Sequence, residues 1–232
     1  VAAVGRRPLA ETPYAENFLK IFKTSDFFGF SFYLTIFVIQ IGLFSLLLKK
    51  LMNTHTMIKL SGLIPAVFTP FDKSGAINLP QIQPYADKLI AEGAYGVFVC
   101  GSTGECTSMT VAERKSVLEA WVKAAAGCMR VIAHVGGTCQ ADCIELARHA
   151  AEQGVDAVGA IAPFYFKPAA VEELVDFYKP IAAAVDPIPF YTYHMPSVTG
   201  VNLPMKEFLE KGSRAIPNLN GIKFTSNNFM EM

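Results

Sequence analysis

A lysine interrupts a short apolar run near the end of the sequence. The run is NGIKF, residues 220–224, and Lys223 is its charged residue. Such a lysine can carry its ammonium out to water along its flexible side chain, which would be a structural role. Alternatively, apolar surroundings disfavour the ammonium form, so that the neutral amine can attack a ketone carbonyl. The two interpretations predict either a strand-end charge or a Schiff-base nucleophile.

Two further segments carry side chains that could assist such a nucleophile. GSTGE, residues 101–105, offers hydroxyl and backbone N–H groups that suit a carboxylate or phosphate, but it could equally be a turn whose Ser or Thr caps the next helix. Tyr193, in YTYHMPSVTG, could transfer a proton through its hydroxyl or simply fill the core with its ring. His134 is expected to be a hydrogen-bonded core residue. Together, the loop, the tyrosine and the lysine predict a Schiff-base site.

These segments follow apolar runs of the kind that form buried strands. Six such runs occur: LIPAVF, GVFVC, RVIAHV, DAVGAIA, IPFYTY and NGIKF. They alternate with amphipathic stretches, such as TVAERKSVLEAWVKAAAG, that mostly stop at glycine, as helices do. Continuous apolar strands are buried on both faces, as in a β/α barrel or a doubly wound sheet. Because no G-x-G-x-x-G follows the first run, we expect an α/β fold of the (β/α)₈ barrel type, with its chemistry after the strand ends.

Composition limits the classes of partner. The 232 residues are 52% hydrophobic and carry 20 Lys+Arg and 20 Asp+Glu, so the formal net charge is zero. No block of like charges indicates nucleic-acid binding, and a small-molecule substrate is expected. The spacing of the five cysteines predicts neither a disulfide framework nor a zinc site. We therefore expect a reducing compartment, no metal and no nucleic-acid partner.

The first part of the chain differs from the rest. Residues 27–48 include no charged residue, and as a helix they would span about 33 Å, enough to cross a bilayer. The segment is either a membrane anchor or a stretch that does not belong to the working protein. We therefore divide the chain into an N-terminal extension with an apolar helix, residues 1–56, and a barrel domain, residues 57–232.

Several motifs occur together in an order typical of one family. AVFTPF, GSTGE, IAPFYFKP, YHMPSVTGVNL and GIKFTS resemble the N-acetylneuraminate lyase and dihydrodipicolinate synthase family, from about Lys59 to the end of the chain. The resemblance implies a class I aldolase barrel that forms a lysine imine with pyruvate and needs no metal or other cofactor. It further implies a cytoplasmic homotetramer.

The resemblance also implies roles for individual residues. Lys223 matches the lysine that forms the Schiff base, and Tyr193 matches the tyrosine that relays protons. Ser102 and Thr103 match the pair that holds the pyruvoyl carboxylate. Thr225 matches a position that contacts the sugar chain in the lyase branch.

One position distinguishes the two branches of the family. The synthase branch usually carries an arginine in the turn after the tyrosine, and Val198 stands at the matching position. An apolar side chain cannot bind the substrate carboxylate that this arginine binds. The resemblance therefore favours cleavage of N-acetylneuraminate to N-acetylmannosamine and pyruvate. A dihydrodipicolinate synthase-like pyruvate aldolase is the alternative.

The number of strands departs from the family pattern. Six apolar runs predict about six of the eight β-α units, so the domain is expected to be truncated at its C-terminus. Open edge strands favour aggregation, and the chain as written is expected not to be an active soluble enzyme. A further alternative is an inactive, membrane-anchored interaction protein that keeps a partial barrel.

Overall fold

The computed structural model describes residues 59–228 and residue 230. The predicted apolar helix at residues 27–48 lies outside the described residues, and the division of the chain at residue 56 stays a prediction. Among the helices of the described part, none is both long enough and apolar enough to cross a membrane.

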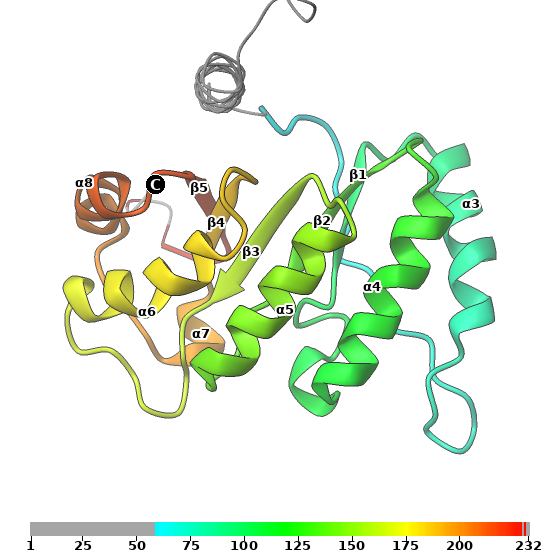
Figure 1. Ribbon diagram of the computed structural model, residues 1–232, viewed down its shortest axis with the longest axis horizontal. Helices are drawn as coiled ribbons and strands as arrows, with labels where there is room; N and C mark the ends of the chain where they lie inside the picture. Colours follow the sequence, from blue (N-terminus) through cyan, green and yellow to red (C-terminus); the bar gives the residue numbers. More distant parts are fainter. Residues whose placement is uncertain (1–58, 229, 231–232) are drawn as a thin grey trace, which may run out of the picture. The chain divides into compact units, whose positions relative to one another are not determined.

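Five parallel strands form one sheet in which neighbours in space are neighbours in the chain (Figure 1). The strands are Gly96–Val99 (β1), Arg130–His134 (β2), Ala157–Ile161 (β3), Phe190–His194 (β4) and Leu219–Phe224 (β5). A doubly wound sheet reverses its strand order at a switch point, whereas this order runs in one direction throughout. The strand order and the helical crossovers are those of a β/α barrel, as predicted.

The first predicted strand is present in reduced form. Ala66 makes an isolated parallel bridge to Phe98, the backbone N–H of Phe98 donates to the Pro65 carbonyl, and that of Val67 donates to the Phe98 carbonyl. Pro65 has no N–H to donate, which shortens the ladder at this edge. The prediction of a full strand at LIPAVF was therefore wrong in extent and right in position.

Helices connect the strands, and the longer ones follow one another in chain order across the view in Figure 1, from α3 on the right to α8 on the left. They are the short 3₁₀ helices Leu79–Gln81 (η2) and Cys106–Ser108 (η3), and the α-helices Ile82–Ala91 (α3), Val111–Ala125 (α4), Gln140–Glu152 (α5), Val171–Ala183 (α6), Pro196–Thr199 (α7) and Met205–Ala215 (α8). Gly93 and Gly154 adopt positive φ just beyond α3 and α5, in agreement with the predicted glycine stops. The helix boundaries thus follow local signals in the sequence.

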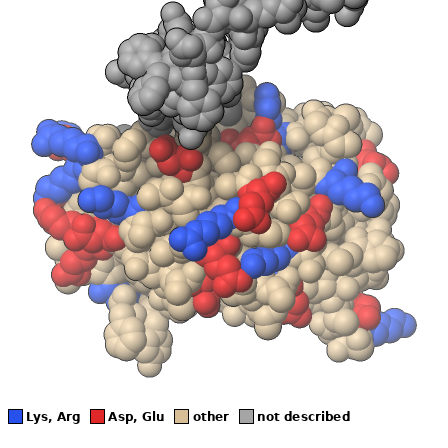
Figure 2. Space-filling model, viewed as in Figure 1, with Lys and Arg blue, Asp and Glu red and all other residues tan. Residues whose placement is uncertain are grey.

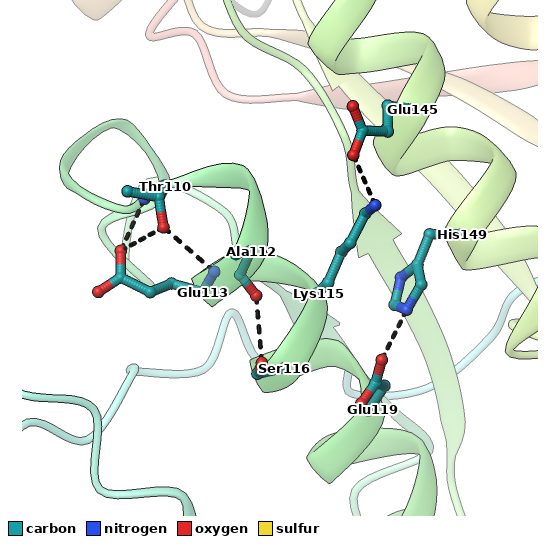
Figure 3. Close-up of polar contacts among 8 residues, drawn as sticks. All are labelled: Thr110, Ala112, Glu113, Lys115, Ser116, Glu119, Glu145 and His149. Carbon is teal, nitrogen blue, oxygen red and sulfur yellow. Dashed lines mark hydrogen bonds and ion pairs between the residues drawn. The ribbon is translucent and has the colours of Figure 1, made fainter.

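The α4 helix begins with a capping box, drawn in Figure 3. The Thr110 hydroxyl accepts from the Glu113 backbone N–H at 3.2 Å, and the Glu113 carboxylate accepts from the Thr110 backbone N–H at 2.7 Å. Such a box supplies acceptors to N–H groups that the first helical turn leaves unpaired. The cap of α4 is therefore Thr110, and the alternative in which Ser102 or Thr103 caps this helix is wrong.

The outer helical surface carries charges of both signs. Lys115 of α4 pairs with Glu145 of α5 at 2.6 Å, and Glu119 accepts from His149 at 2.8 Å (Figure 3). Lys, Arg, Asp and Glu side chains are interspersed over the face shown in Figure 2. This face therefore lacks the single-sign stripe that nucleic-acid binding would require.

The two faces of the sheet have different surroundings. Successive side chains of a strand point to opposite faces, so each strand contributes to two clusters. One set, which includes Val97, Val131 and Phe190, packs against helical side chains such as Trp121 in the large core. The other set forms a smaller inner cluster of Phe98, Ile132, Ala157, Ile161 and Tyr193, joined by Leu60, Ile64, Ala66, Tyr191 and Met195. The inner face therefore carries Tyr193, one of the predicted site residues.

Candidate active site

Lys223 and Tyr193 occupy paired positions on β5 and β4. The Lys223 Nζ lies 3.7 Å from the centroid of the Tyr193 ring and 5.1 Å from that of the Phe98 ring. Both separations fall within the range of about 6 Å over which a ring face attracts a cation. A half-buried lysine amine is thus held against two aromatic rings on the inner face of the sheet.

A β-bulge determines that Lys223 points to this face. Phe190 pairs with Leu219, but the next residue, Tyr191, pairs with Gly221, so Asn220 is an extra residue in β5. In an unbulged ladder the partner of Tyr193 would be residue 222, and Lys223 would point toward the helices. The Asn220 amide donates a hydrogen bond to the Tyr191 hydroxyl, which ties the bulge to β4.

Tyr193 combines a packed ring with a hydroxyl that reaches the site. Its ring is buried in the inner cluster, where it meets Phe98 edge to face. Its hydroxyl donates to the sulfur of Met195 at 3.1 Å. A thioether is a weak acceptor, so this hydrogen bond is easily exchanged for one to a substrate. The packing and chemical interpretations of Tyr193 are therefore compatible.

The GSTGE loop and Tyr193 both contact Met195. The Ser102 hydroxyl donates to the same Met195 sulfur at 3.6 Å. Thr103 follows in this turn with an exposed side chain. The turn is held by the Thr69 hydroxyl, which donates to the Gly104 carbonyl at 2.7 Å. Two hydroxyls at the C-terminal end of β1 are thus available to bind an anion.

Thr225 lies immediately beyond β5. Its hydroxyl is 3.3 Å from the Lys223 Nζ, and its backbone N–H donates to the His194 carbonyl at 2.9 Å. Of the five predicted site residues, Lys223 contacts both Tyr193 and Thr225. Ser102 joins them through Met195.

His134 lies on the same inner face with both ring nitrogens engaged. Its Nδ1 hydrogen-bonds the Cys100 carbonyl at 2.8 Å, and its Nε2 accepts from the Ile161 N–H at 3.2 Å. Burial, aided by the nearby Arg114 charge, lowers the pKa of His134 to about 3. The ring is therefore neutral at physiological pH, and the prediction of a hydrogen-bonded core histidine is confirmed.

A groove of about 660 Å³ runs along the inner face and exposes the lysine. It is lined by Lys59, Leu60, Ile64, Phe98, Ile132, Tyr191, Asn220, Ile222 and Lys223. A concave apolar site with few polar groups is the usual setting for a small ligand. The groove reaches Lys223, whereas Tyr193, Ser102, Thr103 and Thr225 are not part of its lining.

Two residues of this site were not identified from the sequence. Strand alternation places Phe98 on the face opposite Val97 and Val99, so its inward direction was available as a signal. Met195 follows the strand in an irregular turn, and no sequence pattern indicates that its sulfur receives two hydroxyls.

Comparison with known proteins gives consistent matches over the described domain. The profile of the dihydrodipicolinate synthetase family matches residues 59–232. The N-acetylneuraminate lyases of Mus musculus and Homo sapiens are each 42% identical to this chain over 175 residues, which cover 75% of it and 55% of theirs. The chain thus spans little more than half the length of these relatives.

Solved structures give the same result. The N-acetylneuraminate lyase of Proteus mirabilis superposes with a TM-score of 0.73 at 43% identity, covering 75% of this chain and 58% of that one. A dihydrodipicolinate synthase from Aquifex aeolicus gives a TM-score of 0.70 at 31% identity, covering 74% and 57%. The (β/α)₈ fold type is thereby supported by sequence and by structure.

Proposed function

The chain belongs to the dihydrodipicolinate synthetase family, and from that premise we propose that it is a Schiff-base aldolase that cleaves N-acetylneuraminate to N-acetylmannosamine and pyruvate. The observation that carries this proposal is the Lys223 amine, which lies against Tyr193 and lines an open groove. Relatives named N-acetylneuraminate lyase, at 42 to 43% identity, support the choice of substrate.

The reaction begins with attack of the Lys223 amine on the C2 ketone of the open-chain sugar acid. Water leaves, and a protonated imine forms between Nζ and C2. The hydroxyls of Ser102 and Thr103, which lie in one turn at the end of β1, bind the C1 carboxylate. The lysine thus supplies the electron sink, and the chemistry requires no metal or organic cofactor.

Tyr193 acts in the cleavage step. During imine formation its hydroxyl donates its proton to the hydroxide that leaves as water, so that it becomes a phenolate. The phenolate takes the proton of the C4 hydroxyl as the C3–C4 bond breaks, and the bonding pair moves into the imine to give an enamine. N-acetylmannosamine leaves as the aldehyde. The enamine is protonated at C3, and water hydrolyses the imine to release pyruvate and the free amine.

Val198 supports the lyase over the synthase reaction. It lies in α7, directly after the strand that carries Tyr193, and its side chain is 61% exposed. An exposed apolar side chain offers no partner to the second carboxylate that the synthase reaction requires.

We extend the proposal to the cellular setting. The five cysteines are all free, which supports a reducing compartment such as the cytoplasm. The working form is proposed to be a homotetramer, in line with the family resemblance. Membrane contact through residues 27–48 stays a prediction.

Borohydride trapping tests the proposed function. A version of the chain extended to the length of its relatives is incubated with pyruvate, reduced, digested and analysed by mass spectrometry. We expect the reduced adduct on the peptide that contains Lys223 and its loss in Lys223→Ala. Lys167 is an exposed lysine in the loop after β3 and serves as the internal control. An adduct on another lysine, or none at all, would refute the proposal.

A further inference from the structure

Phe98 contacts two residues of the proposed site, Lys223 and Tyr193, although no sequence motif indicated it. Its ring face lies 5.1 Å from the Lys223 Nζ, and the ring meets Tyr193 edge to face with centroids 5.7 Å apart. The same ring meets His134 at 5.7 Å. Phe98 is 4% exposed, so its ring is fixed by these neighbours.

Two glycines lie against opposite edges of this ring. A Cβ at Gly101 would stand 2.7 Å from Cε1 of Phe98, and a Cβ at Gly159 would stand 3.0 Å from Cε2. Neither glycine has a positive φ, so the backbone conformation does not require them. Their missing side chains instead make room for Phe98. The glycine that begins GSTGE is thus explained by the ring beneath it.

We infer that Phe98 is a positioning residue of this site, whose ring face holds the Lys223 ammonium beside Tyr193 and whose edge supports the start of the loop at Gly101. The inference rests on the proposed function in that Lys223 is the proposed nucleophile. A ring face attracts the ammonium and not the neutral amine, so Phe98 favours the protonated resting lysine. It acts through Lys223 and is not itself a catalytic residue.

Phe190 provides a matched control. It is a fully buried phenylalanine of the same sheet, but it points to the helical side, where it packs against Tyr178 at 5.4 Å. Replacing either ring by leucine removes similar volume from the core. The loss of packing is therefore comparable, whereas contact with Lys223 is lost at Phe98 only.

The test measures the acylation of Lys223 as a function of pH. Four versions of the full chain are compared: wild type, Phe98→Leu, Phe190→Leu, and a chain with pentafluorophenylalanine at position 98. The fluorinated ring keeps its shape but reverses the charge distribution of its face, so it separates attraction from packing. Acetic anhydride is added at each pH, and peptides containing Lys223 and Lys167 are quantified by mass spectrometry.

We expect Phe98→Leu to move the midpoint of Lys223 acylation to lower pH by about half a unit, the scale of a partly exposed cation–π contact, and the fluorinated ring, whose face repels a cation, to move it at least as far. Phe190→Leu should leave this midpoint in place, and Lys167 should acylate with the same midpoint in all four chains. An unchanged midpoint with the fluorinated ring, or an equal shift in Phe190→Leu, would overturn the inference.

Other titratable groups also face Lys223. His134 faces it from β2 and remains neutral because burial lowers its pKa to about 3. Tyr193 and Tyr191 face it from β4, and burial raises the pKa of Tyr191. Lys59 lines the same groove from the segment before β1. Because Phe98 itself packs against His134 and Tyr193, the fluorinated ring, which keeps the shape of Phe98, is the decisive comparison with the wild type.

The outcome is independent of the proposed function. Acylation requires no imine, so the midpoint can be measured even if borohydride trapping with pyruvate fails. In that case the aldolase proposal is refuted, and the acylation midpoints still show whether Phe98 positions Lys223. Conversely, pyruvate can be trapped on Lys223 while the acylation midpoint does not move. In that case the aldolase proposal stands and the positioning role of Phe98 is refuted.

Discussion

The Lys223 amine lies 3.7 Å from the centre of the Tyr193 ring, at the position where β5 pairs with β4. The hydroxyl of the same tyrosine donates to the Met195 sulfur at 3.1 Å. The ring and the hydroxyl of Tyr193 therefore have different partners. Their contributions can be separated by substitution.

Tyr193→Phe should abolish proton transfer and preserve the fold. The ring and its contact with Lys223 remain, whereas the hydroxyl is lost. In a version extended to the length of the relatives, we expect pyruvate release from N-acetylneuraminate and deuterium exchange of the pyruvate methyl group to fall by about 10² or more, the scale of acid–base catalysis. The melting temperature should stay near that of the wild type, because the lost partner is a weak thioether acceptor.

Tyr178→Phe is the matched control for this prediction. The Tyr178 hydroxyl is buried on the helical side, where it donates to the Ala160 carbonyl at 3.0 Å. Its removal leaves that carbonyl without this donor, so the melting temperature should fall while exchange continues. If deuterium exchange of pyruvate is unchanged in Tyr193→Phe, Tyr193 has only a packing role.

Gly101→Ala should destabilise the domain. The new Cβ would stand 2.7 Å from the Phe98 ring, and Gly159 restricts the other edge of that ring. Overpacking of this kind costs about 1–3 kcal/mol in the free energy of unfolding, measured by urea denaturation. Gly137→Ala is the control, since its Cβ would meet only the Cys143 sulfur at 3.7 Å. Equal stability of the two variants would show that the ring moves aside.

The stability of the domain should depend on His134 in acid. The folded pKa of His134 is about 3, below its ordinary value of 6.5, because the ring is buried. Between these values the unfolded chain binds a proton that the folded chain does not, so stability is complete above pH 6.5 and is lost as pH falls toward 3. His134→Gln should show a shallower fall in the free energy of unfolding from pH 6.5 to 4. Parallel curves for the two proteins would contradict the assignment of a buried neutral ring.

Val198 should determine which reaction the site performs. We expect a version extended to the length of the relatives, with Val198 unchanged, to cleave N-acetylneuraminate and not to condense pyruvate with aspartate semialdehyde, because Val198 carries no positive charge. Val198→Arg should raise the KM for N-acetylneuraminate, whereas Val198→Leu should leave it nearly unchanged. Synthase activity comparable to lyase activity in the wild type would refute the choice of branch.

The fold class and the site residues followed from local features of the sequence. Continuous apolar runs between helical stretches that stop at glycines such as Gly93 and Gly154 predicted parallel strands in a β/α barrel. Residues after the strand ends predicted where the chemistry would lie, and that rule selected Ser102, Tyr193 and Lys223. These signals are readable because helix ends and strand burial depend on short-range chemistry. The same short-range view overestimated the first strand, where Pro65 interrupts the ladder.

Tertiary structure alone decided how the site is assembled. The bulge at Asn220 turns Lys223 to the inner face, and the Met195 sulfur joins the hydroxyls of Ser102 and Tyr193. Strand side chains alternate with a period of two, so one extra residue reverses the face of every residue that follows. Whether that residue is accommodated depends on the neighbouring strand and on the packing of both faces, and neither is encoded in the five residues around the lysine.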